Sequence, residues 1–207
     1  MNQYGWVLYF CLVSVTFGSV TLNQKDTGFR GIWYAVGSTG DEYVYKYSGG
    51  LGTYCAKHRP FAVYCPEAEK TFFCYGGTPE YSHTQLLHMV SCYDHRTGEV
   101  ALPTIVLDKQ TSDAHDNPVI SVDDEGYIWL FSTSHGTGRP SYIHKSKYPY
   151  AIDEFELITP TRINDSGNVV PMDNFSYFQV WHTPGHGFSV FFTRYSYLAN
   201  PNPFRPA

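Results

Sequence analysis

The sequence predicts an all-β protein made of repeated strand–turn–strand units. Aromatic side chains make up 17% of the 207 residues, and short apolar runs alternate with turn signals along most of the chain. Aromatic and β-branched residues pack well on a pleated surface, and Gly, Pro, Asn and Asp between short apolar runs are typical of β-turns. One strand–turn–strand layout also recurs at intervals of about 60 residues. A hydrophobic content of 43% excludes a disordered chain.

The N-terminal segment predicts a signal peptide over residues 1–20. Its apolar run of about nine residues, 7–15, is too short to span a bilayer, and the small residues Gly18 and Ser19 follow where cleavage could fall. A buried first strand is the alternative, because no Lys or Arg precedes the apolar run. The signal peptide implies a secreted or periplasmic protein. No other segment of the sequence is apolar enough to cross a membrane, so no membrane partner is expected after cleavage.

Three segments carry the repeated layout, and each predicts two strands joined by a tight turn: residues 58–77, 115–135 and 175–194. Further strand-like runs lie between them. Four antiparallel strands per repeat is the layout of a β-propeller blade. We therefore expect a partial β-propeller of about three blades over residues 21–199, followed by an irregular Pro-rich tail at 200–207. A generic β-sandwich is the alternative, although it would not require the regular period.

The cysteines and the charge balance limit the kind of protein further. Cleavage would leave Cys55, Cys65, Cys74 and Cys92, an even number that permits two disulfides in an exported chain. Their spacings match no zinc or redox motif, and we favour the interpretation that they are small buried apolar residues. The net charge is −5 with no basic cluster, so the chain lacks the positive field that nucleic-acid binding needs.

Turn geometry places two pairs of polar residues at the open ends of the second and third hairpins. A three-residue loop ending at Gly126 would set His115 opposite His135, with Cβ atoms roughly 5 Å apart. A four-residue loop at 184–187 would likewise set Tyr177 opposite Arg194. Because both hairpins hold the same place in successive repeats, all four side chains are expected on one face. The other histidines are expected at the surface or in turns: His83, His88, His95, His182 and His186.

Neutral imidazole, phenol and guanidinium groups suit β-elimination from a uronic acid. Arg194 would neutralise the carboxylate, a base would remove the proton on the adjacent carbon, and tyrosine would protonate the leaving glycosidic oxygen. Hydrolysis would instead call for a pair of catalytic carboxylates. Asp113 and Asp116 flank His115 but are interpreted as turn and orienting groups. The reaction requires no cofactor, and the sequence contains no recognisable set of metal ligands.

The residues around these positions resemble the BNR-repeat family of β-propellers that includes polysaccharide lyases cleaving ulvan. The matching stretches are residues 45–54, 57–61, 70–73, 113–120 and 134–141, within a likeness that runs from about residue 28 to residue 195. The resemblance implies a seven-bladed ring, of which this chain would hold about three blades. It also implies an acidic polysaccharide as the substrate.

The same resemblance implies roles for individual residues. His115 and His135 match the histidine pair of the ulvan lyases, Tyr177 the catalytic tyrosine and Arg194 the arginine that neutralises the uronate. His58 and Arg139 are weaker matches, expected to line the substrate groove. Some lyases of this kind hold a structural metal, but no ligand set for one can be matched here.

Two other functions remain open. The segment 121–129 looks like the Asp-box of sialidases, with one residue too many between Asp123 and Gly126, so a sialidase-like glycoside hydrolase is one alternative. A non-catalytic carbohydrate-binding propeller is the other, in which Trp33, Tyr142 and Tyr177 would stack on sugars. The expected convergence of His115, His135, Tyr177 and Arg194 favours the lyase.

Overall fold

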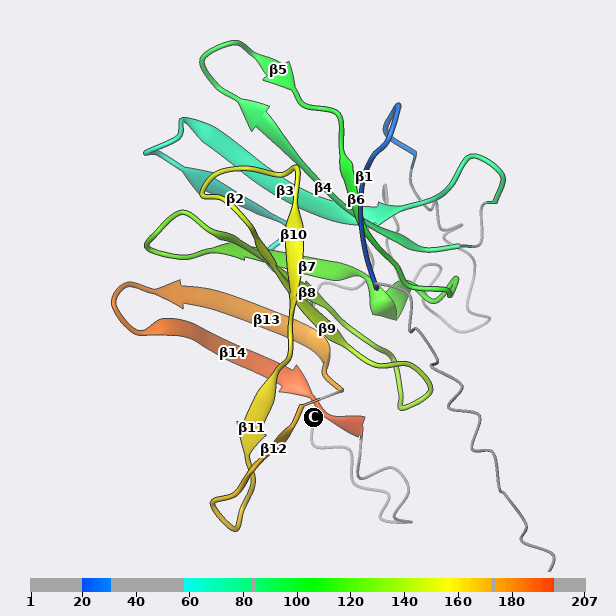
Figure 1. The fold of residues 1–207 in the computed structure, drawn as a ribbon, viewed down its shortest axis with the longest axis vertical. Helices are drawn as coiled ribbons and strands as arrows, with labels where there is room; N and C mark the ends of the chain where they lie inside the picture. The colour runs from blue at the N-terminus through cyan, green and yellow to red at the C-terminus, as the bar shows by residue number, and fades with distance from the viewer. Residues whose placement is uncertain (1–19, 31–57, 83–84, 173, 196–207) are drawn as a thin grey trace, which may run out of the picture.

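The structure is a computed structural model that describes residues 20–30, 58–82, 85–172 and 174–195 (Figure 1). The described residues form antiparallel strands and one 3₁₀ turn, with no α-helix among them. None of these elements is a helix that could span a membrane. The predicted signal peptide up to residue 19, the Pro-rich tail, Cys55, His83 and Trp33 lie outside the described residues.

The first sheet is an antiparallel meander with two added strands. Its path runs β1–β6–β4–β3–β2, and β5 pairs separately with β4. The strands are β1 (Thr21–Lys25), β2 (Ala62–Cys65), β3 (Lys70–Gly77), β4 (Leu87–Asp94), β5 (Glu99–Val100) and β6 (Thr104–Asp108). Four of them follow the predicted up-and-down order. The sheet nevertheless has six strands rather than the expected four, because β1 extends it beside β6 and the short β5 pairs with β4.

The second sheet has the expected four strands, in the order β10–β9–β8–β7. They are β7 (Pro118–Val122), β8 (Ile128–Ser132), β9 (Tyr142–Ser146) and β10 (Phe155–Ile158). Pro118 pairs with Ser132 and Val122 with Ile128, which confirms the predicted register of this hairpin. Its turn requires Gly126, which has φ +84° and lies so near Tyr150 that a Cβ atom would be 2.4 Å from the ring.

The third repeat departs from the prediction in two ways. It forms two separate two-stranded sheets, β11 (Thr161–Ile163) with β12 (Val169–Pro171) and β13 (Ser176–Thr183) with β14 (Gly187–Thr193). The turn between β13 and β14 is also one residue shorter than expected, because Thr183 pairs with Gly187.

A β-bulge changes the register of this hairpin once more. Between Gln179, which pairs with Phe191, and Ser176, which pairs with Thr193, the ladder shifts. The predicted pairing of Tyr177 with Arg194 is therefore wrong, since Arg194 follows the strand end and Tyr177 lies inside the bulge.

The sheets stack on one another with β7 between two cores (Figure 1). Ile120 packs toward the first sheet, together with Phe72, whereas its neighbour Val119 packs toward β13, together with Phe178. All five residues of β7 are buried, as the sequence predicts for a strand that is apolar on both faces. Cys65, Cys74 and Cys92 are buried free thiols in the first core, which agrees with their interpretation as small apolar residues.

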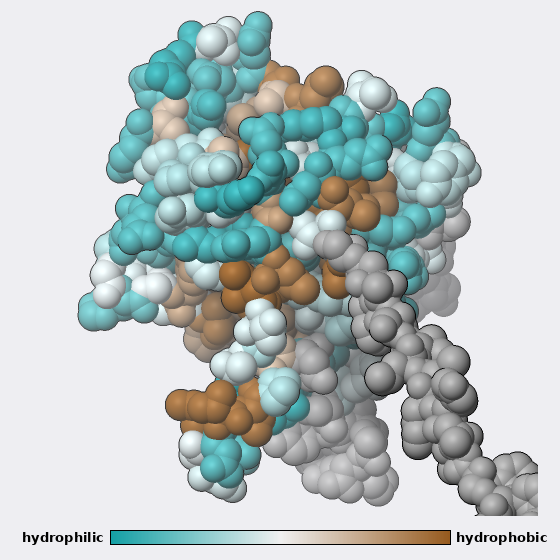
Figure 2. Space-filling view, viewed as in Figure 1, coloured by the Kyte–Doolittle hydropathy of each residue, from teal (hydrophilic) through white to brown (hydrophobic). Residues whose placement is uncertain are grey.

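Apolar side chains also remain exposed beyond these cores. On β13 and β14, Trp181 is 44% exposed and Phe191 68% exposed. Figure 2 shows a second apolar area on the β11–β12 hairpin, where Ile163 and Val169 are mostly exposed. The third repeat thus presents apolar surface that no described residue covers.

Candidate active site

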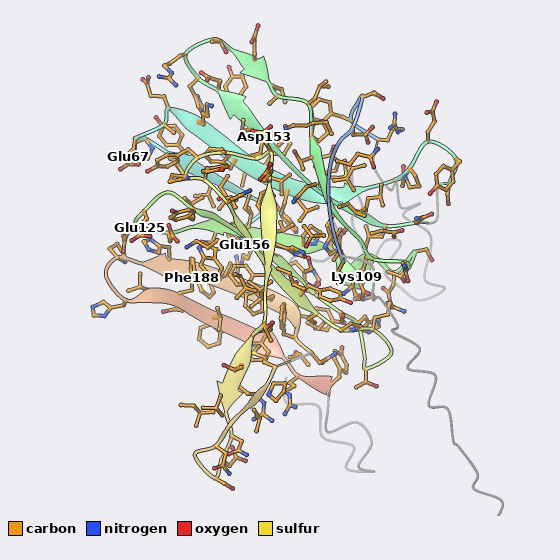
Figure 3. The ribbon with its side chains drawn as sticks, in the orientation of Figure 1. Glu67, Lys109, Glu125, Asp153, Glu156 and Phe188 are labelled. Atoms are coloured by element: carbon orange, nitrogen blue, oxygen red, sulfur yellow. The ribbon has the colours of Figure 1, made fainter. Side chains whose placement is uncertain are left out.

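The candidate site lies at the end of the sheets where β7 and β13 begin and β8 ends. The hairpin turns that carry Glu67 and Glu125 lie at the opposite end. Figure 3 shows Lys109 at this end of the sheets and the two glutamates at the other. Two loops build the site: the β6–β7 loop, which contains the 3₁₀ turn η1 (Ala114–Asp116), and the β8–β9 loop at 133–141. The first loop leads into β7 and the second follows β8. Because β7 and β8 are paired, their hydrogen bonds bring the two loops together.

His115 and His135 form a stacked pair just beyond the last paired residues of β7 and β8. Their ring centroids are 4.1 Å apart, with an angle of 23° between the ring planes. The two rings are therefore adjacent, as the predicted register requires.

Asp113 bridges the two histidines with one carboxylate. Its Oδ1 lies 2.7 Å from Nδ1 of His115, and its Oδ2 lies 2.9 Å from Nδ1 of His135. An ionised carboxylate only accepts hydrogen bonds, so each imidazole donates from Nδ1 and each neutral ring keeps an acceptor lone pair on Nε2. One aspartate thus fixes the same tautomer in both rings.

The surroundings of Asp113 keep this carboxylate ionised. Partial burial opposes ionisation, but the hydrogen bonds from the side chain and backbone of His115 and from the side chain of His135 outweigh it. The pKa of Asp113 therefore lies below its usual range. The sequence suggested an orienting role for Asp113 but could not show that it serves both rings, because they come from different loops.

Tyr177 lies within contact distance of three histidines. Its ring centroid is 5.5 Å from that of His58, 5.7 Å from that of His115 and 6.3 Å from that of His135. Tyr177 occupies the bulge of β13 with φ +49°, a left-handed conformation that is uncommon for a residue other than glycine. A bulge changes the direction in which a side chain points. In β13 the bulged residue is Tyr177, and its phenol ring lies against the histidine pair.

Arg139 is held beside the histidines by a buried carboxylate. Asp116 is fully buried; its Oδ2 accepts a hydrogen bond from Nε of Arg139 at 2.8 Å, and its Oδ1 accepts one from the backbone N–H of His135 at 2.5 Å. A terminal nitrogen of Arg139 also lies 3.8 Å from Oδ2 of Asp113. Asp116 therefore fixes both the arginine and the loop that carries His135.

His58 lies beneath Tyr177 rather than on an open groove, because its side chain is fully buried. Burial is the main reason why its pKa falls to about 4, and the nearby His115 lowers it further. His88 and His144 are also fully buried. The expectation that His88 lies at the surface is therefore wrong: it belongs to β4, where its Nδ1 lies 2.8 Å from Oγ of Ser132.

These buried histidines predict that the protein loses stability in acid. The pKa of His144, like that of His58, is lowered by burial to about 4. Between about pH 6.5 and pH 4 the unfolded chain binds protons that the folded chain excludes, so the free energy of unfolding falls as pH falls. Each of the two histidines contributes roughly 3 kcal/mol to this loss, at 1.36 kcal/mol per pKa unit.

Urea denaturation of the His144→Gln variant checks this prediction. We expect its unfolding free energy to depend less steeply on pH than that of the unmodified protein between pH 7 and pH 4.5. The matched control is His186→Gln, since His186 is exposed in the turn before β14. Parallel pH profiles for the unmodified protein and His144→Gln would contradict the assignment.

Arg194 and Tyr195 directly follow β14. The Nε atom of Arg194 is buried without a hydrogen-bond partner, and none of the ion pairs among the described residues includes this arginine. The ring of the buried Tyr195 lies 5.7 Å from that of His135. The sequence gives no signal for Tyr195, because this residue lies beyond the predicted strand, where no pairing register applies.

The same cluster offers a set of metal ligands. Asp113, His115 and His135 each present one ligand atom, and these atoms all lie within 4.8 Å of one another. A carboxylate with two imidazoles is a donor set that zinc accepts. Residue spacing in the sequence does not reveal this ligand set, because His135 comes from a different loop than Asp113 and His115.

Comparisons with known proteins give a structural likeness only. No protein-family model matches the chain, and no curated protein matches it. Two similar solved structures are described as a polysaccharide lyase of a new family, the PL25 ulvan lyase, the second with -[GlcA(1-4)Rha3S]- bound. Each has a TM-score of 0.54 and 19% sequence identity, over 83% of this chain and 36% of the other. The chain thus spans about a third of those lyases and has a fold similar to that part of them.

Proposed function

We propose that this protein is a polysaccharide lyase of the ulvan-lyase type, which cleaves a uronic-acid polysaccharide by β-elimination. The observation that carries the proposal is the cluster of His115, His135 and Tyr177, with Asp113 fixing both imidazoles. It supplies a base and an acid within one small region, and no cofactor is needed for the reaction.

The reaction begins at the carbon next to the uronate carboxylate. Nε2 of one imidazole takes the proton from this carbon, and the electron pair of the C–H bond forms a C=C double bond. The bond to the glycosidic oxygen breaks, and the Tyr177 hydroxyl gives its proton to that oxygen. The products are an unsaturated uronate and a new reducing end, after which the imidazolium releases its proton to solvent and the Tyr177 phenolate takes one up.

The carboxylate must be neutralised before its neighbouring proton becomes acidic enough to remove. Arg194 is the residue proposed for this step, because its Nε has no hydrogen-bond partner and it forms no ion pair with the described residues. A guanidinium matches a carboxylate in a bidentate pair. Arg139 is already engaged by Asp116, so its proposed task is to line the groove.

The neighbouring structures support the class of substrate and the architecture. One of those lyases was solved with a saccharide that contains glucuronate, which is the kind of acidic polymer that we propose here. We also propose that the sheets are blades of a BNR-type β-propeller, about three of seven, secreted or exported to the periplasm. The exposed apolar side chains of β13 and β14 support this architecture, since a further blade would cover them.

The arrangement favours elimination over sialidase-like hydrolysis. Asp113 and Asp116 accept hydrogen bonds from His115, His135 and Arg139, so neither is an unengaged catalytic acid. Asp123, in the Asp-box-like segment, accepts hydrogen bonds from the backbone N–H of Tyr127 and the indole of Trp129. It therefore closes a turn, as Asp-box residues do.

Incubation with ulvan tests the proposal. We expect ultraviolet absorbance from the conjugated unsaturated uronate to rise in step with new reducing ends, and His115→Ala to abolish the rise. Reducing ends without the absorbance would indicate hydrolysis. Retardation of the protein in an ulvan gel with neither signal would indicate a binding module, and either result would overturn the lyase assignment.

A further inference from the structure

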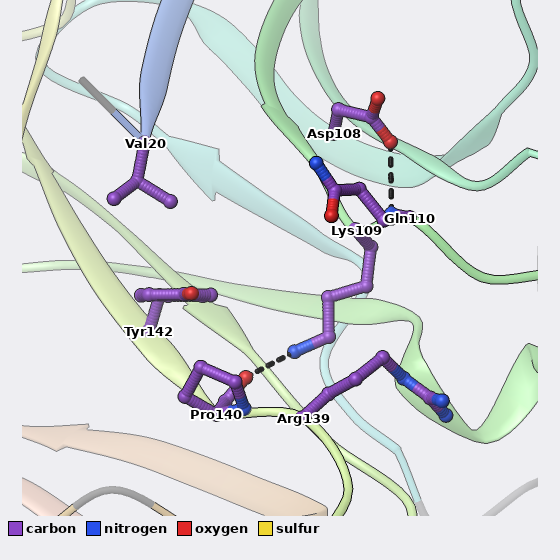
Figure 4. Close-up of a pocket in the computed structure, with 7 residues that line it drawn as sticks. All are labelled: Val20, Asp108, Lys109, Gln110, Arg139, Pro140 and Tyr142. Atoms are coloured by element: carbon purple, nitrogen blue, oxygen red, sulfur yellow. Dashed lines mark hydrogen bonds between the residues drawn. The ribbon is translucent and has the colours of Figure 1, made fainter. Parts of the chain in front are cut away.

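A small cavity lies beside the candidate site, between the end of β6 and the β8–β9 loop (Figure 4). Its volume is about 170 Å³, and it is lined by Val20, Asp108, Lys109, Gln110, Arg139, Pro140 and Tyr142. Tyr142 faces Val20 across the cavity, and the Lys109 side chain extends toward Pro140. The elimination chemistry proposed above uses none of this space.

Lys109 is a buried cation in the wall of this cavity. Its residue is 4% exposed, and its Nζ donates hydrogen bonds to Oγ of Ser134 at 2.8 Å and to the carbonyl oxygen of Pro140 at 2.6 Å. An ammonium has three N–H groups, so one more remains for another acceptor. Burial lowers the pKa of Lys109 to about 8, which leaves the amine mostly charged at neutral pH.

This cation has no carboxylate partner among the described residues. None of their ion pairs includes Lys109. The acidic group that most favours its charge is Asp116, which is already bonded to Arg139. Buried charges in proteins are normally paired, because an unpaired one loses its hydration without compensation. Asp108 also lines the cavity, but its carboxylate accepts hydrogen bonds from the Gln85 side chain and the Gln110 backbone and forms no ion pair with Lys109. Among the described residues the Lys109 ammonium therefore has no paired counter-charge, which an anionic group could supply.

Arg139 connects this cavity to the histidine cluster. The side chain lines the cavity, while its guanidinium reaches Asp116 and the neighbourhood of Asp113. A polymer held against His115 and Tyr177 would therefore have a neighbouring sugar unit beside Arg139. The ring of Tyr142, 5.3 Å from the Lys109 ammonium, offers an apolar wall to such a unit.

We propose that this cavity is a second anion subsite, which takes an acidic substituent of the polysaccharide, a carboxylate or a sulfate ester, on the Lys109 ammonium. This proposal rests on the proposed function only for the kind of polymer that is bound, and it does not require that the protein cleave the polymer. It would select acidic polymers that carry a charged group outside the sugar unit being cleaved.

Binding measurements on Lys109→Gln test the subsite without relying on cleavage. Glutamine removes the charge but keeps a polar N–H group in the cavity wall. We expect the affinity for ulvan to fall about 10-fold or more, the range of a charge-assisted hydrogen bond. Desulfated and carboxyl-reduced ulvan identify the substituent, because the variant and the unmodified protein should bind equally the polymer that lacks the recognised group.

The control is Lys147→Gln, which removes one exposed lysine paired with Glu154 outside the cavity. Circular dichroism verifies folding, and Lys109→Met replaces Lys109→Gln should the latter unfold. A direct probe is inorganic sulfate, which should raise the melting temperature of the unmodified protein more than that of the variant at matched ionic strength. Equal ulvan affinity and equal sulfate response in the two proteins would overturn the subsite. Loss of cleavage with ulvan binding intact would overturn only the lyase function.

Discussion

Asp113→Asn is expected to reduce the rate of ulvan cleavage by about 10²- to 10⁴-fold, the usual contribution of a positioned acid or base. An amide has one acceptor oxygen and one donor nitrogen, whereas the carboxylate accepts from Nδ1 of both His115 and His135. One of the rings must then turn its Nδ1 lone pair toward the amide nitrogen. That ring would carry its proton on Nε2 and could no longer accept the substrate proton.

The variant should fold normally, since the side chain changes by one atom and remains partly exposed. Asp165→Asn provides the control, because Asp165 is an exposed residue in the turn between β11 and β12. Rates are measured by ultraviolet absorbance at saturating ulvan, so that the effect appears in kcat. Unchanged kcat in Asp113→Asn would show that the carboxylate is not needed to keep the lone pair on Nε2 of the imidazole that acts as the base.

Tyr177→Phe is expected to reduce kcat by a similar 10²- to 10⁴-fold factor. The substitution removes only the hydroxyl proposed to protonate the leaving oxygen. The ring that contacts His58, His115 and His135 stays in place, so the affinity for ulvan should change little. The effect should therefore fall on kcat rather than on KM.

Tyr64→Phe is the matched control, because Tyr64 lies on β2 and its side chain is 54% exposed. Kinetics on ulvan should leave this control at the unmodified rate. A Tyr177→Phe protein that cleaves ulvan normally would exclude the phenol as the acid and direct attention to Tyr195, whose ring contacts His135.

The second hairpin shows how far the sequence predicts the site. A turn that ends with Gly126 in the left-handed region fixes the register of β7 and β8, and this register brings the loops of His115 and His135 together. The apolar residues of β7 likewise predict a strand buried on both faces. These features are local, because they depend on one turn and on the two strands that it joins.

The third hairpin shows where such reasoning fails. A bulge adds a residue to one strand without any clear signal in the sequence, so the position of Tyr177 relative to Arg194 could not be counted from the turn. The bridge from Asp113 to both rings depends on two loops, and the cavity at Lys109 depends on the approach of β6 to a distant loop. Both arise from tertiary packing, which residue spacing does not encode.

The proposed acid, Tyr177, and the histidine pair come from two different sheets. The histidines extend from one ladder and the phenol from another, and no strand pairing joins β7 to β13. Val119 and Phe178 belong to one apolar cluster across this boundary. Residues 59–60 also join the two strands, because Arg59 forms backbone hydrogen bonds with Phe178 and Val180 on β13, and Pro60 accepts one from Ile120 on β7. Substitutions of these packed apolar residues, although they do not contact the polymer, would therefore change the distance between the Tyr177 ring and the imidazole of His115.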